Sequence, residues 1–156
     1  MSTDGMMSKS EIIAYLEDYA VNEGMGARLF HAWASTSSTP SLRGALRMME
    51  LREQAHADLL AQRAKELGGS GTAAPDQTMI GDFLAFLGAP DRSDADKLRE
   101  FMRLAPPDQV VDRLNKDVAR LGSDPESQAL LRAIVDDERS TLWALREAAS
   151  AIPAAA

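Results

Sequence analysis

Apolar residues recur every three or four positions along most of this chain, which is the period of an amphipathic α-helix. The pattern predicts helices at residues 9–36, 40–67, 93–105, 108–121 and 125–149. A shorter apolar stretch at 79–87 predicts an extra helix, and the double proline at 106–107 interrupts what would otherwise be one long helix. The pattern indicates only helices, so the expected fold class is all-α.

The residues at the ends of these segments are typical of helix termini. Either Ser8 or Ser10 is expected to cap the first helix, and Thr39, which precedes Pro40, is expected to cap the second. The glycine pair at 68–69 ends the second helix, and the polar stretch that follows predicts a loop.

The second half of the chain weakly repeats the first. When Pro40 is placed on Pro125, an offset of 125 − 40 = 85 residues, Arg28 and Leu29 match Arg113 and Leu114, Ala34 matches Ala119, Ser38 matches Ser123, Leu46 and Arg47 match Leu131 and Arg132, Glu53 matches Glu138, and Leu60 matches Leu145. Two similar helix pairs joined by a longer connection predict an antiparallel four-helix bundle with a long crossover between its second and third helices. We expect the bundle to cover residues 9–150, with disordered ends at 1–8 and 151–156.

Two polar residues interrupt the apolar face of the second predicted helix. Its inward positions are Leu42, Leu46, Met49, Glu53, His56, Leu60 and Ala64. Burying an unpaired carboxylate is unfavourable, so Glu53 needs an opposite charge, a hydrogen-bond network or a metal ion. A Glu-x-x-His spacing also places both side chains next to each other, as in helix-bundle sites for two metal ions. A buried ion pair between Glu53 and His56 is the simpler alternative.

Glutamates also occupy inward positions of the first and last helices. Glu23 lies on the apolar face of the first helix, and it reaches a height similar to that of Glu53 if the two helices are antiparallel. Glu138 lies on the apolar face of the last helix, where Thr141 stands at the position that matches His56. Threonine is a poor ligand for a divalent metal. Three acids and one histidine are therefore the main candidates for metal ligands.

The third predicted helix offers two weaker candidates. The repeat places Asp108 opposite Glu23, although Asp108 lies beside the apolar face rather than on it. Asp112, one turn later, is the alternative. We expect Asp136 and Asp137, which precede Glu138, to be solvated.

Composition excludes several classes of function. The chain has no cysteine, which excludes disulfides, thiolate metal sites and cysteine nucleophiles. Its net charge of −7 argues against a general nucleic-acid binder. No stretch is long and apolar enough to cross a membrane, and the first ten residues lack the apolar core of a signal peptide, so a cytoplasmic location is expected.

Three stretches carry a resemblance to a known family. They read Asn22-Glu23-x-x-x-Ala27-Arg28-Leu29-Phe30-x-x-Trp33-Ala34, Arg52-Glu53-Gln54-Ala55-His56-Ala57-Asp58-Leu59-Leu60, and Asp136-Asp137-Glu138-Arg139-Ser140-Thr141-Leu142-Trp143. Together they resemble the ferritin-like superfamily, particularly its small rubrerythrin-like members. In that family, a glutamate from each of the first and third helices joins Glu-x-x-His from the second and fourth to hold two iron or manganese ions that react with oxygen or peroxide.

The resemblance implies an incomplete dimetal-carboxylate motif. Glu23, Glu53 and His56 would form one half of the site, and Glu138 would bridge to the other. In the other half, Asp108 or Asp112 stands for a glutamate, and Thr141 stands for a histidine and would leave an open coordination position.

We expect a metal-binding protein that takes one or two iron or manganese ions, with oxygen or peroxide chemistry as its expected reaction. Electrons would come from an unidentified donor protein, because the chain has no cysteine-rich rubredoxin segment. The alternative is a non-catalytic bundle that has lost tight metal binding and acts as a structural or interaction protein. A homodimer is expected in either case, and a cage-forming iron store is a third, weaker alternative.

Overall fold

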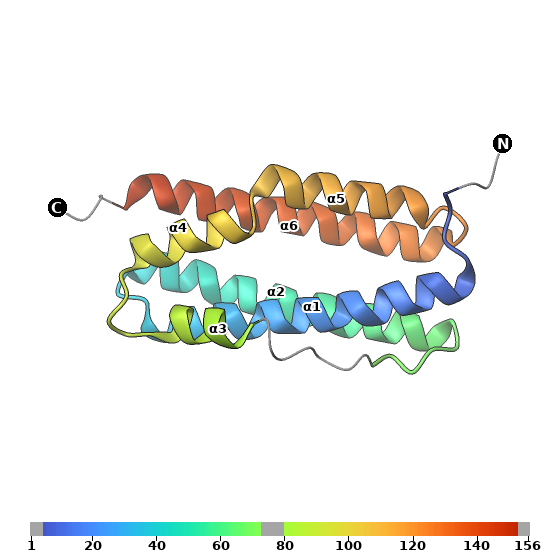
Figure 1. The fold of residues 1–156 in the computed structure, drawn as a ribbon, viewed down its shortest axis with the longest axis horizontal. Coiled ribbons are helices and arrows are strands. Elements are labelled where there is room, and N and C mark those ends of the chain that lie inside the picture. Colours follow the sequence, from blue (N-terminus) through green and yellow to red (C-terminus); the bar gives the residue numbers. More distant parts are fainter. Residues whose placement is uncertain (1–4, 73–79, 153–156) are drawn as a thin grey trace.

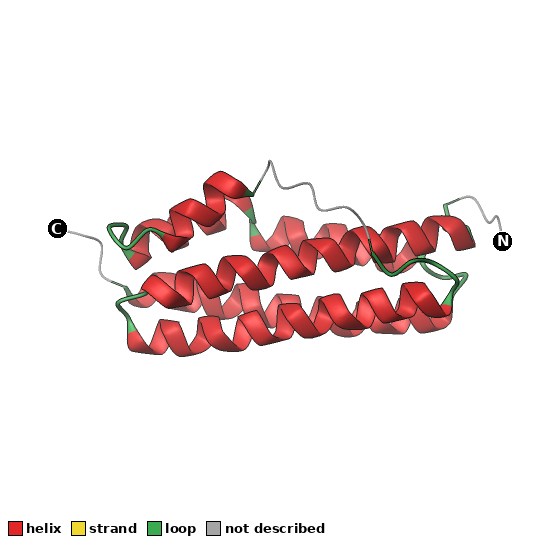
Figure 2. Ribbon diagram, turned by 90° about the horizontal axis from the view of Figure 1, so that it is seen from below, coloured by secondary structure: helices red, strands yellow, loops and turns green. Residues whose placement is uncertain are grey.

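The computed structural model describes residues 5–72 and 80–152. These residues form α-helices and no strand, with α1 at Lys9–Thr36, α2 at Pro40–Glu66, α3 at Gly81–Gly88, α4 at Asp94–Leu104, α5 at Pro107–Arg120 and α6 at Pro125–Ala151 (Figures 1 and 2). The all-α prediction is confirmed. No helix among the described residues combines the length and the hydrophobicity that crossing a bilayer requires.

The long helices run along one axis in two neighbouring pairs (Figure 1). Helices α1 and α2 lie side by side, as do α5 and α6, and α2 also contacts α6. The connection between the two pairs carries α3, which contacts α1, and α4, which contacts α6. Helix α3 corresponds to the extra helix predicted at 79–87, of which Met79 lies outside the described residues.

The prolines at 106–107 separate α4 from α5, as predicted. Helix α4 ends at Leu104, and Pro107 is the first residue of α5, where the missing amide hydrogen is not needed for an intrahelical hydrogen bond. The break sets the rotational phase of α5 independently of α4, which affects the candidate ligands on that helix.

Ser8 rather than Ser10 caps the first helix. The Ser8 hydroxyl accepts a hydrogen bond from the backbone of Glu11, and the Glu11 carboxylate accepts one from the backbone of Ser8, which forms a capping box. Two orphan amide groups at the start of α1 are satisfied in this way.

Parts of both ends that were expected to be disordered pack against the helices. Residues 1–4 and 153–156 lie outside the described residues, so the prediction is not tested there. Met7 is buried, and its backbone nitrogen donates a hydrogen bond to the carbonyl oxygen of Arg120 at 2.8 Å. Ile152 packs against the apolar cluster at the other end of the molecule.

A buried carboxylate, Asp94, holds the turn between α1 and α2 against the start of α4. It accepts hydrogen bonds from Trp33 Nε1 at 2.9 Å, from Ser37 Oγ at 2.9 Å and from Thr39 Oγ1 at 2.8 Å. Thr39 occupies the N-cap position of α2 but makes no side-chain capping bond, because its hydroxyl donates to Asp94 instead. Burial opposes ionisation, but these hydrogen bonds outweigh it and hold the pKa of Asp94 below its usual value.

We expect Asp94→Ala to lower the free energy of unfolding at pH 7 by about 3 kcal/mol, because it leaves several buried donors without an acceptor. The melting temperature should fall by about 10 °C. Urea unfolding followed by circular dichroism measures the change. The exposed Asp91 gives a matched control, and Asp91→Ala should change the stability by less than about 0.5 kcal/mol. Equal losses in the two variants would contradict the role assigned to Asp94.

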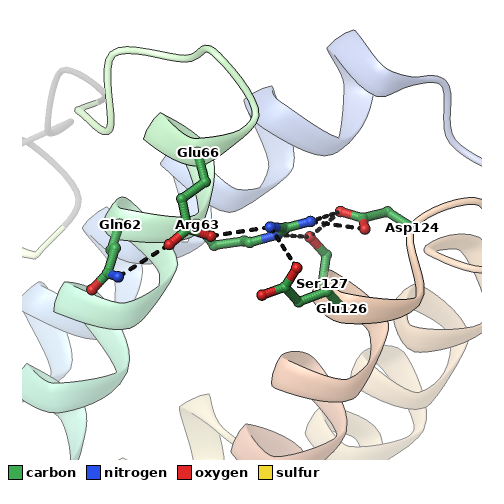
Figure 3. A network of polar contacts seen from close by, with 6 residues as sticks. All are labelled: Gln62, Arg63, Glu66, Asp124, Glu126 and Ser127. Carbon is green, nitrogen blue, oxygen red and sulfur yellow. Dashed lines mark hydrogen bonds and ion pairs between the residues drawn. The ribbon is translucent and has the colours of Figure 1, made fainter.

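A second polar network ties the end of α2 to the start of α6 (Figure 3). The Arg63 guanidinium donates to both carboxylate oxygens of Asp124 at 2.9 and 3.0 Å and to Ser127 Oγ at 3.2 Å. It also pairs with Glu66 at 3.0 Å and with Glu126 at 2.8 Å. Arg63 therefore fixes the C-terminal end of α2 relative to the N-terminal end of α6.

Two apolar clusters fill the interior at different levels along the long helices, and a polar level separates them. One contains Ile12, Leu16, Ala20, Leu60, Ala64, Leu131, Ile134 and Val135 with their neighbours, and the other contains Phe30, Trp33, Leu42, Leu46, Met49, Leu98 and Leu145 with theirs. On α1, α2 and α6, the residues between the two clusters include buried acids and a histidine. The candidate site therefore lies between the two halves of the core.

Candidate metal centre

Four polar side chains from three helices meet in the interior. Glu23 comes from α1, Glu53 and His56 come from α2, and Glu138 comes from α6. Each offers one ligand atom, and these four atoms all lie within 4.8 Å of one another. Glu23, Glu53 and His56 are only 4 %, 6 % and 5 % exposed, and the Glu138 side chain is 13 % exposed. This group, which we call the acid cluster, could hold a metal ion.

The helix geometry explains why these residues meet. Glu53 and His56 are three residues apart, so they project from neighbouring points on one face of α2. Gly26 on α1 leaves room for the Glu53 carboxylate, since a Cβ atom at this position would overlap Glu53 Oε2. Close approach of α1 and α2 at Gly26 thus allows the acid of one helix to lie against the backbone of the other.

Both ring nitrogens of His56 face carboxylates. His56 Nδ1 lies 2.9 Å from Glu23 Oε2 and 3.8 Å from Glu138 Oε1, and Nε2 lies 3.0 Å from Asp137 Oδ2. Burial disfavours the charged ring, but the hydrogen bonds with Glu23 and Asp137 outweigh it and raise the pKa of His56. Since Nδ1 faces the acid cluster, it is the nitrogen available to a metal, while Asp137 can hold the proton on Nε2.

The acids of the cluster are held in an unfavourable environment. Burial, followed by the negative charges of Glu138 and Glu23, raises the pKa of Glu53. Burial and the charge of Glu23 likewise raise the pKa of Glu138. Glu138 Oε1 is buried and has no hydrogen-bond partner among the described residues. A bound cation would satisfy this oxygen and offset the repulsion between the carboxylates.

The aspartates predicted on the third helix do not join the acid cluster. The Asp108 side chain is 90 % exposed and lies 3.8 Å from Arg146, and Asp112 is also exposed. The buried face of α5 carries Leu114 and Val118. At 3.6 residues per turn, Asp108 and Asp112 project about 120° and 160° away from Leu114. The sequence repeat therefore gave the wrong rotational phase for α5.

Thr141, which was expected to leave an open coordination position beside a bound metal, is paired with a neighbouring side chain. It is buried, and its hydroxyl accepts a hydrogen bond from Arg52 Nη2 at 2.7 Å. The positive charge of Arg52 partly opposes the rise in the pKa of Glu53 and Glu138. The position that matches His56 in the repeat is thus occupied by a threonine paired with an arginine.

Sequence reasoning missed three residues around the acid cluster. Arg52 and Asp137 each precede a cluster glutamate in the chain, and Asp137 contacts His56 although it was expected to be solvated. Tyr19 lies on α1 one turn before Glu23, and burial, followed by the charge of Glu23, raises the pKa of its hydroxyl. Of the three, only Tyr19 could have been found from the sequence, because it carries a hydroxyl at an inward position one turn before Glu23.

Comparison of the chain with protein families, with curated proteins and with solved structures gave no match. The interpretation of the acid cluster therefore depends on its own geometry and chemistry.

Proposed function

We propose that the protein is a ferritin-like metal-binding protein that holds iron or manganese through Glu23, Glu53, His56 and Glu138. The observation that carries the proposal is the convergence of four buried ligand atoms within 4.8 Å. Three buried carboxylates and one imidazole are unfavourable as an empty core, and a divalent ion removes this penalty.

The residues present suit a divalent transition metal. Carboxylate oxygens favour hard ions such as Mn²⁺, and an imidazole nitrogen extends the preference to Fe²⁺. The contact between His56 Nε2 and Asp137 resembles the outer hydrogen bond that fixes the ring of a metal-binding histidine. The buried Oε1 of Glu138 lies 3.8 Å from His56 Nδ1 and has no hydrogen-bond partner in the part of the chain that the structure describes.

A redox role with oxygen or peroxide is part of the proposal. Iron or manganese would supply one-electron chemistry there, and the electrons would come from another protein. Burial of the acid cluster between two apolar regions would exclude bulk water from a bound ion. The chain's own residues would therefore orient the ion and shield it.

Metal analysis of the purified protein tests the proposal. Mass spectrometry should find iron or manganese bound to the chain, and adding Mn²⁺ to metal-free protein should raise its melting temperature. Metal-free protein whose melting temperature ignores added Fe²⁺ and Mn²⁺ would overturn the proposal. It would favour the non-catalytic alternative, in which the contacts of His56 with Glu23 and Asp137 satisfy the acids without metal.

The metal-free protein should lose stability as the pH rises from about 5.5 to 8, by roughly 2 kcal/mol. The pKa values of Glu53, Glu138 and His56 are raised in the folded state, so in this range the folded state holds protons that the unfolded glutamates have already released and the unfolded histidine is releasing. Their contribution is complete at low pH and is lost as the pH rises through the folded pKa values. Asp94, with a lowered pKa, acts in the opposite direction but only in acid.

Urea unfolding in a chelator at several pH values measures this dependence. With Mn²⁺ present the trend should reverse, because the metal competes with protons for the same side chains. Metal-free stability that is flat or rises between pH 5.5 and 8 would contradict the raised pKa values.

A further inference from the structure

Arg52 brings a positive charge to the side of the acid cluster that lacks ligands. Its Nη2 donates a hydrogen bond to Thr141 Oγ1 at 2.7 Å, which ties α2 to α6 at this level. Its Nε is buried without a hydrogen-bond partner among the described residues, as is Glu138 Oε1. The guanidinium therefore lies at the level of the acid cluster, beside the helices that carry Glu53 and Glu138.

The charge of the buried site balances with a single ion. Glu23, Glu53 and Glu138 contribute three negative charges when ionised, and Arg52 contributes one positive charge. One divalent ion and a neutral His56 bring the sum over these groups to −3 + 2 + 1 = 0, in which the half-exposed Asp137 is not counted. A second divalent ion would leave an excess of two positive charges in a buried site, which is strongly unfavourable.

The available metal ligands also favour a single ion. His56 is the only nitrogen ligand in the acid cluster, and Thr141 stands at the matching position on α6. Helices α4 and α5 contribute no acid or histidine to the cluster, as far as the described residues extend. A second ion would share the bridging carboxylates but have few ligands of its own.

We infer that the guanidinium of Arg52 takes the place of a second metal ion, so that the site binds one divalent cation per chain. This inference rests on the proposed function and specifies its stoichiometry. Arg52 acts through Thr141 and the acids rather than as a ligand, so it is a positioning residue.

Equilibrium dialysis against Mn²⁺, with metal counted by mass spectrometry, tests the inference without any measurement of activity. Wild-type protein should bind one Mn²⁺ per chain and give the electron paramagnetic resonance spectrum of an isolated ion. The double variant Arg52→Gln with Thr141→His removes the guanidinium and adds an imidazole. It should bind two ions per chain and give the spectrum of a magnetically coupled pair.

A matched control removes a surface arginine of α6 instead. Arg139 pairs with Asp136 and its side chain is 56 % exposed. Arg139→Gln with Thr141→His should bind one ion per chain, because Arg52 is still present.

Two ions in the wild type, one ion in the Arg52 double variant, or two ions in the Arg139 control would each overturn the inference. No ion in the wild type would overturn the proposed function as well, so the two failures can be distinguished. If circular dichroism shows that the double variant does not fold, the wild-type count and spectrum still decide.

Discussion

Glu53→Gln should abolish the stabilisation of the protein by metal. For wild-type protein, a metal concentration about a thousand times its dissociation constant should add about 4 kcal/mol to the free energy of unfolding. This corresponds to a rise of about 10 °C in melting temperature. The variant should show no rise, because its neutral amide replaces one of the three carboxylates of the acid cluster.

Without metal, the same substitution should stabilise the protein. Burial and the neighbouring acids make a charged Glu53 unfavourable, whereas glutamine keeps the shape without the charge. At pH 8 the free energy of unfolding of the metal-free variant should therefore be about 1 kcal/mol higher than that of the metal-free wild type. Glu50→Gln, one turn earlier on α2 and outside the acid cluster, should keep the full response to metal.

This combination separates a metal ligand from a structural acid. A Glu53 that served only as an ion-pair partner would give a less stable variant and an unchanged response to metal. Differential scanning fluorimetry with and without Mn²⁺ measures both quantities, and that pattern would contradict our account.

Gly26→Ala should weaken metal binding by about a hundredfold, the upper range for residues that orient a ligand. A methyl group at Gly26 would overlap Glu53 Oε2 and would push the carboxylate out of its place in the acid cluster. The displaced group is the end of a flexible side chain, so the fold should survive, and the free energy of unfolding should fall by less than the free energy of metal binding. Calorimetric titration with Mn²⁺ measures the affinity.

Gly24→Ala is the matched control on the same helix. A Cβ atom at Gly24 meets nothing within 4 Å, so alanine should keep the metal affinity. It should also raise the stability by about 0.5–1 kcal/mol, because alanine favours the helix. Equal affinities in the two variants would show that Gly26 does not position Glu53.

The sequence pattern predicted the helices and much of the acid cluster for a simple reason. A buried polar residue stands out on an apolar stripe, and the 3.6-residue period shows which positions point inward. Glu23, Glu53 and His56 interrupt otherwise apolar faces, and the structure brings them together with Glu138. The helix break at 106–107 followed from proline chemistry alone.

The pattern failed where a contact depends on more than the direction of the Cα–Cβ bond. Asp108 was placed by alignment to the repeat, with Asp112 one turn later as the alternative, but α5 starts at Pro107 and is rotated to bury Leu114 and Val118. Arg52 follows no inward period, and only its long side chain brings the guanidinium back to Thr141. Periodicity describes where a side chain begins, and the position of its end depends on the neighbouring helix.

Asp137 illustrates the same difficulty with a short side chain. It is half exposed and lies in a run of acids, which favours a solvated position. Its contact with His56 depends on how close α6 lies to α2, and a single sequence does not contain that distance.

The most direct test of the central claim is the location of the ion. Crystals grown with Mn²⁺ and measured for anomalous scattering should show one peak between Glu23, Glu53, His56 and Glu138, about 2.0–2.3 Å from the ligand atoms. One peak there, with the Arg52 guanidinium still bonded to Thr141, would match our account. Crystals saturated with Mn²⁺ that show no peak at the acid cluster, or show the metal bound elsewhere, would contradict it.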